Sequence, residues 1–91
     1  GFALLPATPN PFSVVTEFAC AVPVHSEIRV EILDALGRRV RLIDEGEVEA
    51  GIHEYLWDGT DNIGTTSPGG IYFCRLTTPT GILVQRVMVV K

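Results

Sequence analysis

Two cysteines, Cys20 and Cys74, carry the most reactive side chains in this chain of 91 residues. Two thiols can form a disulfide or stay reduced as small buried apolar groups. A zinc site or a catalytic thiol is not indicated, because the sequence has no Cys-x-x-Cys pair and no histidine at ligand spacing. The chemistry expected of these residues is therefore structural, and a bridge would imply an oxidising compartment.

Oxygen-bearing side chains of the kind that bind calcium gather in one short segment. The segment contains Asp58, Thr60, Asp61 and Asn62, followed by the turn residue Gly64. Their spacing departs from the Asp-x-Asx-x-Asx-Gly pattern, and the closing glutamate of a calcium loop is missing. Asp and Asn at turns commonly bond their own backbone. The segment therefore predicts a polar turn and no metal site.

Histidines and serines, the usual general bases and nucleophiles, are not arranged for catalysis. His25 and His53 have no cysteine or carboxylate paired with them in the sequence, and we interpret both as solvated surface residues. The serines stand in turns without a nucleophile elbow, and the carboxylates are scattered. Gly69 and Gly70 precede a strand rather than a helix, so they form no phosphate loop. We expect a non-enzymatic protein without a cofactor.

Composition excludes two further classes of partner. The formal net charge is -4 and the sequence pI is about 4.9, so the surface repels the phosphates of nucleic acids and of anionic lipids. No apolar run approaches the ~20 residues that span a bilayer, so no membrane insertion is expected. The chain begins at Gly1 instead of Met, which predicts a processed chain or an excised piece.

Turn residues divide the sequence at short intervals, which predicts an all-β protein. Nine glycines and six prolines supply these breaks. Residues 1–12 are expected to form an N-terminal arm or first strand, and residues 13–91 a single two-sheet sandwich domain of about seven strands. The remaining strands are expected at 15–22, 27–33, 38–43, 52–57, 71–78 and 82–90. The acidic residues from 44 onward are assigned to a solvated loop.

The turn that ends in Gly37 predicts a hairpin with a three-residue loop, in which Gly37 is left-handed. This register places Ile32 opposite Val40 on the buried face. It also places Glu31 opposite Arg41 on the exposed face, as a pair worth ~0.2–1 kcal/mol.

The expected strands fit the order of an immunoglobulin-like sandwich. Cys20 and Cys74 then occupy the two strands that carry the inter-sheet disulfide of immunoglobulin domains, and Tyr72 has the spacing of a tyrosine corner. Paired placement, alternation and the even count favour a Cys20–Cys74 bridge over two buried thiols. In the chain-entropy model such a bridge stabilises by ~4 kcal/mol.

The N-terminal arm carries Phe2, Leu4 and Leu5, which would expose apolar surface if the arm were free. Its three prolines keep it extended but restrict it to a sheet edge. We therefore expect the arm to cover an edge in its own domain or, as an assembly arm, in a neighbouring copy.

Four short motifs follow one another along the chain: Pro9 to Phe12, an Asp-x-x-Gly-Arg turn, a Trp-Asp-Gly loop and a Gly-Ile-Tyr-Phe strand. The ordered set resembles the immunoglobulin-like domain of flagellar hook-capping (FlgD-like) proteins and the C-terminal sorting domains of type IX secretion. The resemblance covers residues 9–91. The matching residues are Asn10, Pro11, Asp34, Gly37, Arg38, Trp57, Gly70 and Tyr72.

This resemblance implies a non-catalytic extracellular or cell-surface module that serves secretion, surface attachment or assembly. The implied partners are a secretion machinery or a parent protein. The alternative is a self-assembling structural subunit of a filament or surface layer, whose partners are copies of itself. A carbohydrate- or protein-binding adhesin is the third hypothesis, with Tyr55 and Trp57 as its support. Trp57 is more simply explained as a lid of the core.

Overall fold

Alternation of apolar and polar side chains accounts for the strands of this protein. The computed structural model describes residues 1–91 and contains strands and turns but no helix. In β2 (Thr16–Val22) and in the first half of β3 (Ser26–Asp34), every second residue is buried, as expected for strands with one face on a core. No helix that could cross a membrane is present.

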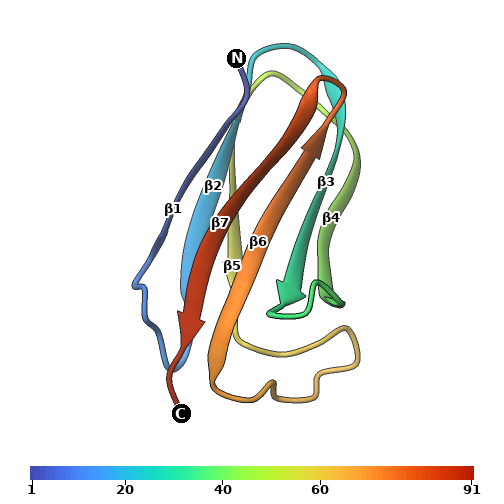
Figure 1. Ribbon diagram of the computed structural model, residues 1–91. Helices are drawn as coiled ribbons and strands as arrows, with labels where there is room; N and C mark the ends of the chain where they lie inside the picture. Colours follow the sequence, from blue (N-terminus) through green and yellow to red (C-terminus); the bar gives the residue numbers. More distant parts are fainter.

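Seven strands form two antiparallel sheets that pack face to face (Figure 1). One sheet has the order β1-β2-β5 and the other the order β4-β3-β6-β7. The remaining strands are β1 (Ala3–Thr8), β4 (Arg39–Val48), β5 (Gly51–Trp57), β6 (Gly70–Thr78) and β7 (Gly81–Val89). The predicted all-β, immunoglobulin-like sandwich is confirmed.

Three aromatic rings close one end of the core. Phe12 and Tyr72 both stand edge-on to Trp57, with ring centroids 5.5 and 5.3 Å from the indole. Trp57 is 1% exposed and its Nε1 donates to the Thr60 carbonyl at 2.9 Å. The Tyr72 hydroxyl donates to the Pro68 carbonyl, the upstream bond of a tyrosine corner. Trp57 is thus a core lid and not an exposed stacking platform.

The N-terminal arm forms β1 and pairs with β2 of the same chain. Phe2 and Leu4 pack against the core, whereas Leu5 is 39% exposed. Beyond β1, the Asn10 side chain bonds the backbone of β7 in both directions: its Nδ2 donates to the Arg86 carbonyl and its Oδ1 accepts from the Met88 N–H. The arm and the Asn-Pro motif therefore join the two sheets along one side.

The β3–β4 turn has the predicted form. Gly37 has a φ of 83° and donates to the Asp34 carbonyl at 2.9 Å, while Asp34 N–H donates to the Arg38 carbonyl at 2.8 Å. The predicted register beyond the turn is wrong, because Ile32 lies opposite Arg41 instead of Val40. Two β-bulges insert Val40 and Ile43 as extra residues, and both pack against the core.

The predicted exposed pair of Glu31 with Arg41 is also wrong. Glu31 lies opposite Leu42, is only 2% exposed, and bonds Arg39 and Arg75 instead of forming a surface pair with Arg41. The acidic stretch that was assigned to a loop also differs, since β4 continues to Val48. Cross-strand pairing overrides the weak strand propensity of these acids; the Arg29–Glu45 ion pair at 2.8 Å is one example.

Cys20 and Cys74 are free thiols in the structure, so the predicted disulfide is not formed. Both side chains face the core, at 0% and 2% exposure. Burial raises the pKa of Cys20 and raises that of Cys74 to about 12. Alternation correctly placed both residues inside, but it carries no information on the close Cα approach that a bridge requires.

Candidate functional site at the hairpin end of the sandwich

An open groove of about 700 Å³ lies at the end of the sandwich that holds the β3–β4 turn. We call this the hairpin end; it is the lower end in Figure 1, where the C-terminus also lies. The groove runs between the β3–β4 turn on one side and the β5–β6 loop, residues 58–69, on the other. The first residues of β6 contribute to its lining.

Asp34 organises the turn that forms one wall. Its Oδ1 accepts hydrogen bonds from the backbone N–H groups of Leu36 and Arg38, both at 2.9 Å. Its Oδ2 accepts from Arg38 Nε at 2.8 Å. The Arg38 backbone bond, followed by its side-chain bond and the Leu36 bond, holds the pKa of Asp34 below its ordinary value. The Asp-x-x-Gly-Arg motif thus builds a rigid turn.

Asp61 organises the loop that forms the opposite wall. Its Oδ1 accepts from the backbone N–H groups of Ile63 and Thr65 at 3.0 and 2.9 Å. The neighbouring Asn62 reaches β4, where its Oδ1 accepts from the Leu42 N–H at 2.9 Å. The loop is therefore shaped by its own backbone bonds and anchored to the edge of the second sheet.

A second anchor joins the loop to β4 through Arg41. Its Nη1 donates to Thr60 Oγ1 at 2.7 Å and lies 3.3 Å from Asp58 Oδ1. The Thr60 hydroxyl bond lowers the pKa of Asp58, with a smaller contribution from the Arg41 charge. The side-chain oxygens of Asp58 and Thr60 therefore form hydrogen bonds that hold the loop, as predicted for the calcium-like segment. The absence of metal binding there stays a prediction, and the structure has no group of three or more acidic, histidine or cysteine side chains placed to hold a metal ion.

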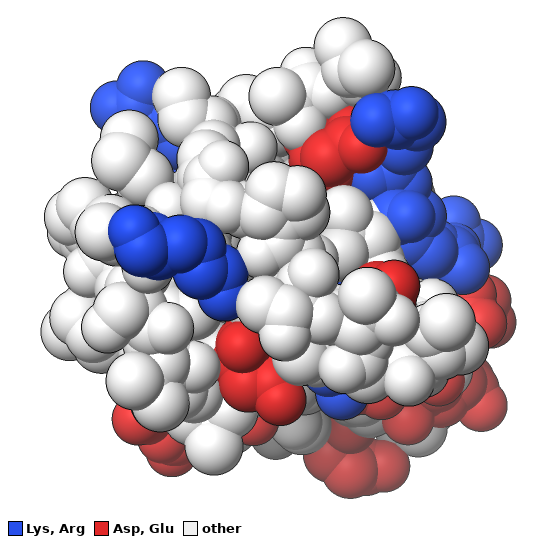
Figure 2. Space-filling view, turned by 90° about the horizontal axis from the view of Figure 1, so that it is seen from below, with Lys and Arg blue, Asp and Glu red and all other residues white.

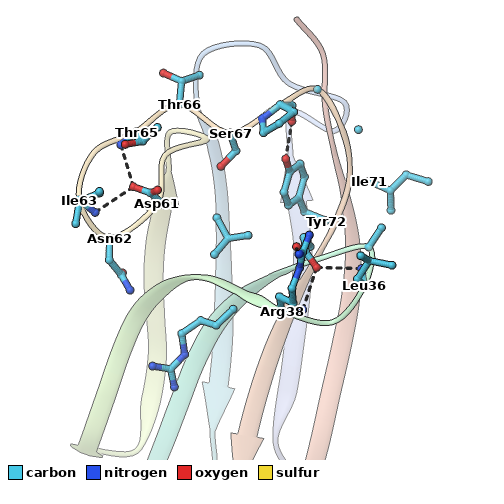
Figure 3. A pocket seen from close by; sticks show the side chains of 17 residues that line it. Leu36, Arg38, Asp61, Asn62, Ile63, Thr65, Thr66, Ser67, Ile71 and Tyr72 are labelled. Atoms are coloured by element: carbon cyan, nitrogen blue, oxygen red, sulfur yellow. Dashed lines mark hydrogen bonds and ion pairs between the residues drawn. The ribbon is translucent and has the colours of Figure 1, made fainter.

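Apolar side chains stand on both rims of the groove. Leu36 is 78% exposed and Ile63 is 86% exposed, and the two lie on opposite sides (Figure 3). Arg38 projects between them from the turn, and Tyr72 forms part of the floor. Seen from this end, most of the surface is uncharged, and several of the basic and acidic side chains lie against one another (Figure 2). Such a rim suits contact with a polypeptide better than acid–base chemistry.

The structure separates the predicted motif residues into two groups. Asp34, Arg38, Gly70 and Tyr72 line the groove, and Gly37 lies in the same turn. The remaining members, Asn10, Pro11 and Trp57, belong to the β7 edge and the aromatic lid. Leu36 and Ile63 were not identified from the sequence, although an apolar residue in the middle of a turn is the signal that could have found them.

His25 is exposed at the surface, as predicted, but its ring has partners that the sequence did not indicate. Its ring lies between two glutamates of the β4 region, with Nδ1 2.9 Å from Glu49 Oε1 and Nε2 3.3 Å from Glu47 Oε1. The Glu49 bond, followed by the Glu47 bond, raises the pKa of His25. The partners are separated in sequence and are joined only by the pairing of β3 with β4.

Comparison with known proteins places the chain in a family. Residues 14–81 match the model of the FlgD Ig-like domain. The basal-body rod modification protein FlgD of Escherichia coli K12 is 36% identical over 74 residues, which are 81% of this chain and 30% of that protein. The chain thus spans less than a third of that relative.

Two solved structures share the fold. FlgD from Xanthomonas campestris has a TM-score of 0.63 at 24% identity, covering 96% of this chain and 65% of that one; its study concerns hook capping essential for flagellar assembly. PorZ, a bacterial surface component of the type IX secretion system of Porphyromonas gingivalis, has a TM-score of 0.55 at 19% identity, covering 100% and 12%. With its motifs, sheet order and matched residues taken together, this chain belongs to the FlgD Ig-like domain family.

Proposed function

We propose that this chain is a non-catalytic, extracellular immunoglobulin-like module that serves the assembly or surface attachment of a larger exported protein. The observation that carries the proposal is the family match over residues 14–81. FlgD relatives are named for the basal-body rod and studied for hook capping, and PorZ is a surface component of a secretion system. The FlgD relatives support the assembly part of the proposal, and PorZ supports the surface part.

The groove at the hairpin end supplies the contact site in this proposal. Its walls are rigid because Asp34 and Asp61 each hold two backbone N–H groups. Rigid walls lower the entropic cost of binding. Leu36 and Ile63 offer exposed apolar surface on the two rims, and isolated apolar side chains of this kind become the buried centre of an interface when a partner covers them.

A chimera of E. coli FlgD tests the proposal. The Ig-like segment of that protein is replaced by this chain, and hooks are counted by electron microscopy in cells that lack their own FlgD. We expect hooks to form, and we expect Leu36→Ser with Ile63→Ser to reduce their number without lowering the melting temperature of the isolated domain. Ile82→Ser, at an exposed position in the β6–β7 hairpin, is the matched control. A folded chimera that forms no hooks contradicts the assembly role.

A reporter fusion tests whether this chain directs secretion in the way that type IX sorting domains do. A fluorescent protein is placed before residue 1, and the fusion is expressed in a type IX-secreting bacterium and in a strain without that system. Surface reporter in the first strain alone would assign the chain to sorting. Reporter retained inside both strains would restrict the function to assembly or attachment in another exported protein.

A further inference from the structure

A sandwich of two open sheets has four edge strands, and three of them are protected here along at least part of their length. The edge of β7 is covered by residues 10–12: the Asn10 side chain bonds the strand backbone, and Phe12 exchanges backbone bonds with Met88 and Val90. The edge of β1 contains Pro6 and a register shift. The Gln85 side chain also occupies it, accepting from Ala7 N–H and donating to the Leu4 carbonyl.

The edge of β4 is protected in a different way. Two bulges interrupt its pairing with β3, and bulges twist an edge so that another strand cannot lie along it. Asn62 also occupies the Leu42 N–H from the outer side. Regular, unpaired backbone is therefore interrupted in all three strands: in β4 it is limited to residues 44–48, and in β7 to residues 81–85.

The fourth edge, β5, has none of these devices. It pairs with β2 from Gly51 to Trp57 without a register shift and contains no proline. Its outer side has no neighbouring strand. No side chain bonds its backbone, and no backbone bond outside the ladder reaches it. Regular, unpaired N–H and C=O groups of this kind are a template for one more strand.

Side chains on the outer face of β5 define what such a strand must carry. Ile52 and Leu56 are 60% and 63% exposed, and Glu54 lies between them on the same face. The sheet β1-β2-β5 contains no lysine or arginine, and Glu54 takes part in none of the ion pairs of the structure. The residue that an added strand places opposite Glu54 would be its first cationic neighbour.

A second copy of this chain does not meet that requirement. The antiparallel register that sets Ile52 of one copy opposite Leu56 of the other also sets Glu54 opposite Glu54. Like charges directly opposite each other destabilise a strand pair. The acidic residue therefore disfavours self-pairing and favours a different sequence.

We propose that the free edge of β5 is a β-addition site for an extended segment of another polypeptide. That segment carries lysine or arginine opposite Glu54 and apolar residues opposite Ile52 and Leu56, so its pattern is apolar-x-basic-x-apolar. Main-chain bonds to β5 provide the binding, and the alternate side chains provide the specificity. The site is separate from the groove at the hairpin end and does not depend on the function proposed for it.

A pair of blocked peptides tests this site on the whole chain. One has the sequence Thr-Val-Thr-Arg-Thr-Val-Thr, and in the other glutamate replaces arginine. Titrations followed by amide NMR and hydrogen exchange report both the affinity and the location of binding. We expect the arginine peptide to shift and protect amides of β5, and to bind about 1.4- to 5-fold more tightly than the glutamate peptide, the range for one cross-strand charge pair.

Two variants show whether Glu54 sets the preference. Glu54→Lys is expected to reverse the order of the two peptides. Glu17→Lys makes the same charge change one strand away, on β2, and is expected to keep the preference for arginine. Equal binding of the two peptides, or shifts confined to β4 or β7, would overturn the proposal. Concentration-dependent dimerisation that protects β5 would overturn it too, because the occupant would then be a second copy.

Discussion

Glu31 is the residue that best shows how packing determines chemistry in this protein. It lies on the outer face of the four-stranded sheet, yet Arg39 Nε at 2.8 Å and Arg75 Nη2 at 3.0 Å cover both carboxylate oxygens. Burial by itself would raise the pKa of Glu31, but the bonds to Arg75 and Arg39 outweigh it and lower the pKa. The carboxylate joins strands β4 and β6 across β3.

Replacing this carboxylate should weaken the fold. We expect Glu31→Gln to lower the free energy of unfolding by about 1–3 kcal/mol, less than for a fully buried pair because both arginines reach solvent. The lowered pKa means that this stabilisation is present above the ordinary pKa of Glu and disappears as the pH falls through the folded-state value. Urea unfolding at several pH values measures both effects. Glu27→Gln, an exposed change on the same strand, is the control, and equal stability of the two variants contradicts the role of Glu31.

His25 should make stability depend on pH in the opposite sense. Its pKa is raised in the folded state, so its contribution is fully present below the unfolded value of about 6.5. The contribution is lost as the pH rises through the folded-state pKa. We expect an NMR titration midpoint above 6.5, and a decline in melting temperature toward pH 8 that is smaller in His25→Gln. A midpoint at or below 6.5 would show that the two glutamates do not bind the ring in solution.

The two thiols should be unreactive while the protein is folded. Burial raises the pKa of Cys20 and Cys74, and the thiolate is the reactive form. We expect no labelling by a maleimide under native conditions at pH 7. Unfolding without a reductant should then release two labelled thiols. Finding no thiols after unfolding would mean that the isolated protein contains the bridge that the structure lacks.

Among the elements, the sheet edges distinguish this domain most clearly. The Asn-Pro motif closes the β7 edge with one side chain, the bulges and Asn62 close β4, and Gln85 closes β1. Only β5 keeps a regular and unpaired backbone along its whole length. The edges of β1, β4 and β7 are therefore covered or interrupted by residues of this chain, whereas the edge of β5 is available to another polypeptide.

Loss of the Asn10 amide should open the β7 edge. Asn10→Ala removes two hydrogen bonds at once, so we expect a loss of about 1–2 kcal/mol in unfolding free energy. Amide exchange at Met88 should become faster. Asn62→Ala removes one bond to a different edge and should leave exchange at Met88 unchanged. Unchanged exchange at Met88 in Asn10→Ala would show that the side chain does not act as a substitute strand.

At the scale of the whole molecule, the N-terminal arm supplies the first strand of the sandwich. β1 pairs with β2 and brings Phe2 and Leu4 against the core, while the following segment reaches β7. The same pairing could be made to a neighbouring copy, which would join molecules head to tail into an open polymer. The two arrangements share their contacts and differ in which chain supplies the arm.

Deleting residues 1–8 separates these arrangements. We expect the truncated chain to be a monomer of lower melting temperature, because the deletion exposes the edge of β2 and removes apolar contacts. Light scattering and thermal unfolding of both lengths provide the measurement. If the full chain forms a polymer and the truncated chain a monomer of equal stability, the arm is donated between copies. If neither size nor stability changes, the arm has no structural role.

The sequence alone determined the sandwich, its strand order and much of its core. Alternation in residues 16–22 and 26–32 placed the buried face correctly, and Gly37 specified the turn, because both signals are local. Local spacing also identified the tyrosine corner of Tyr72 and the lid formed by Trp57. These features depend on neighbours within a few residues and on the period of a strand.

Only the tertiary structure decided the contacts between distant residues. The bulges at Val40 and Ile43 shifted the register, so that Glu31 met Arg39 and Arg75 instead of Arg41. His25 gained two glutamates, and the cysteines remained thiols. The groove formed where a turn and a loop far apart in sequence meet. Such contacts depend on how two twisted sheets pack, and no local pattern of side chains encodes that geometry.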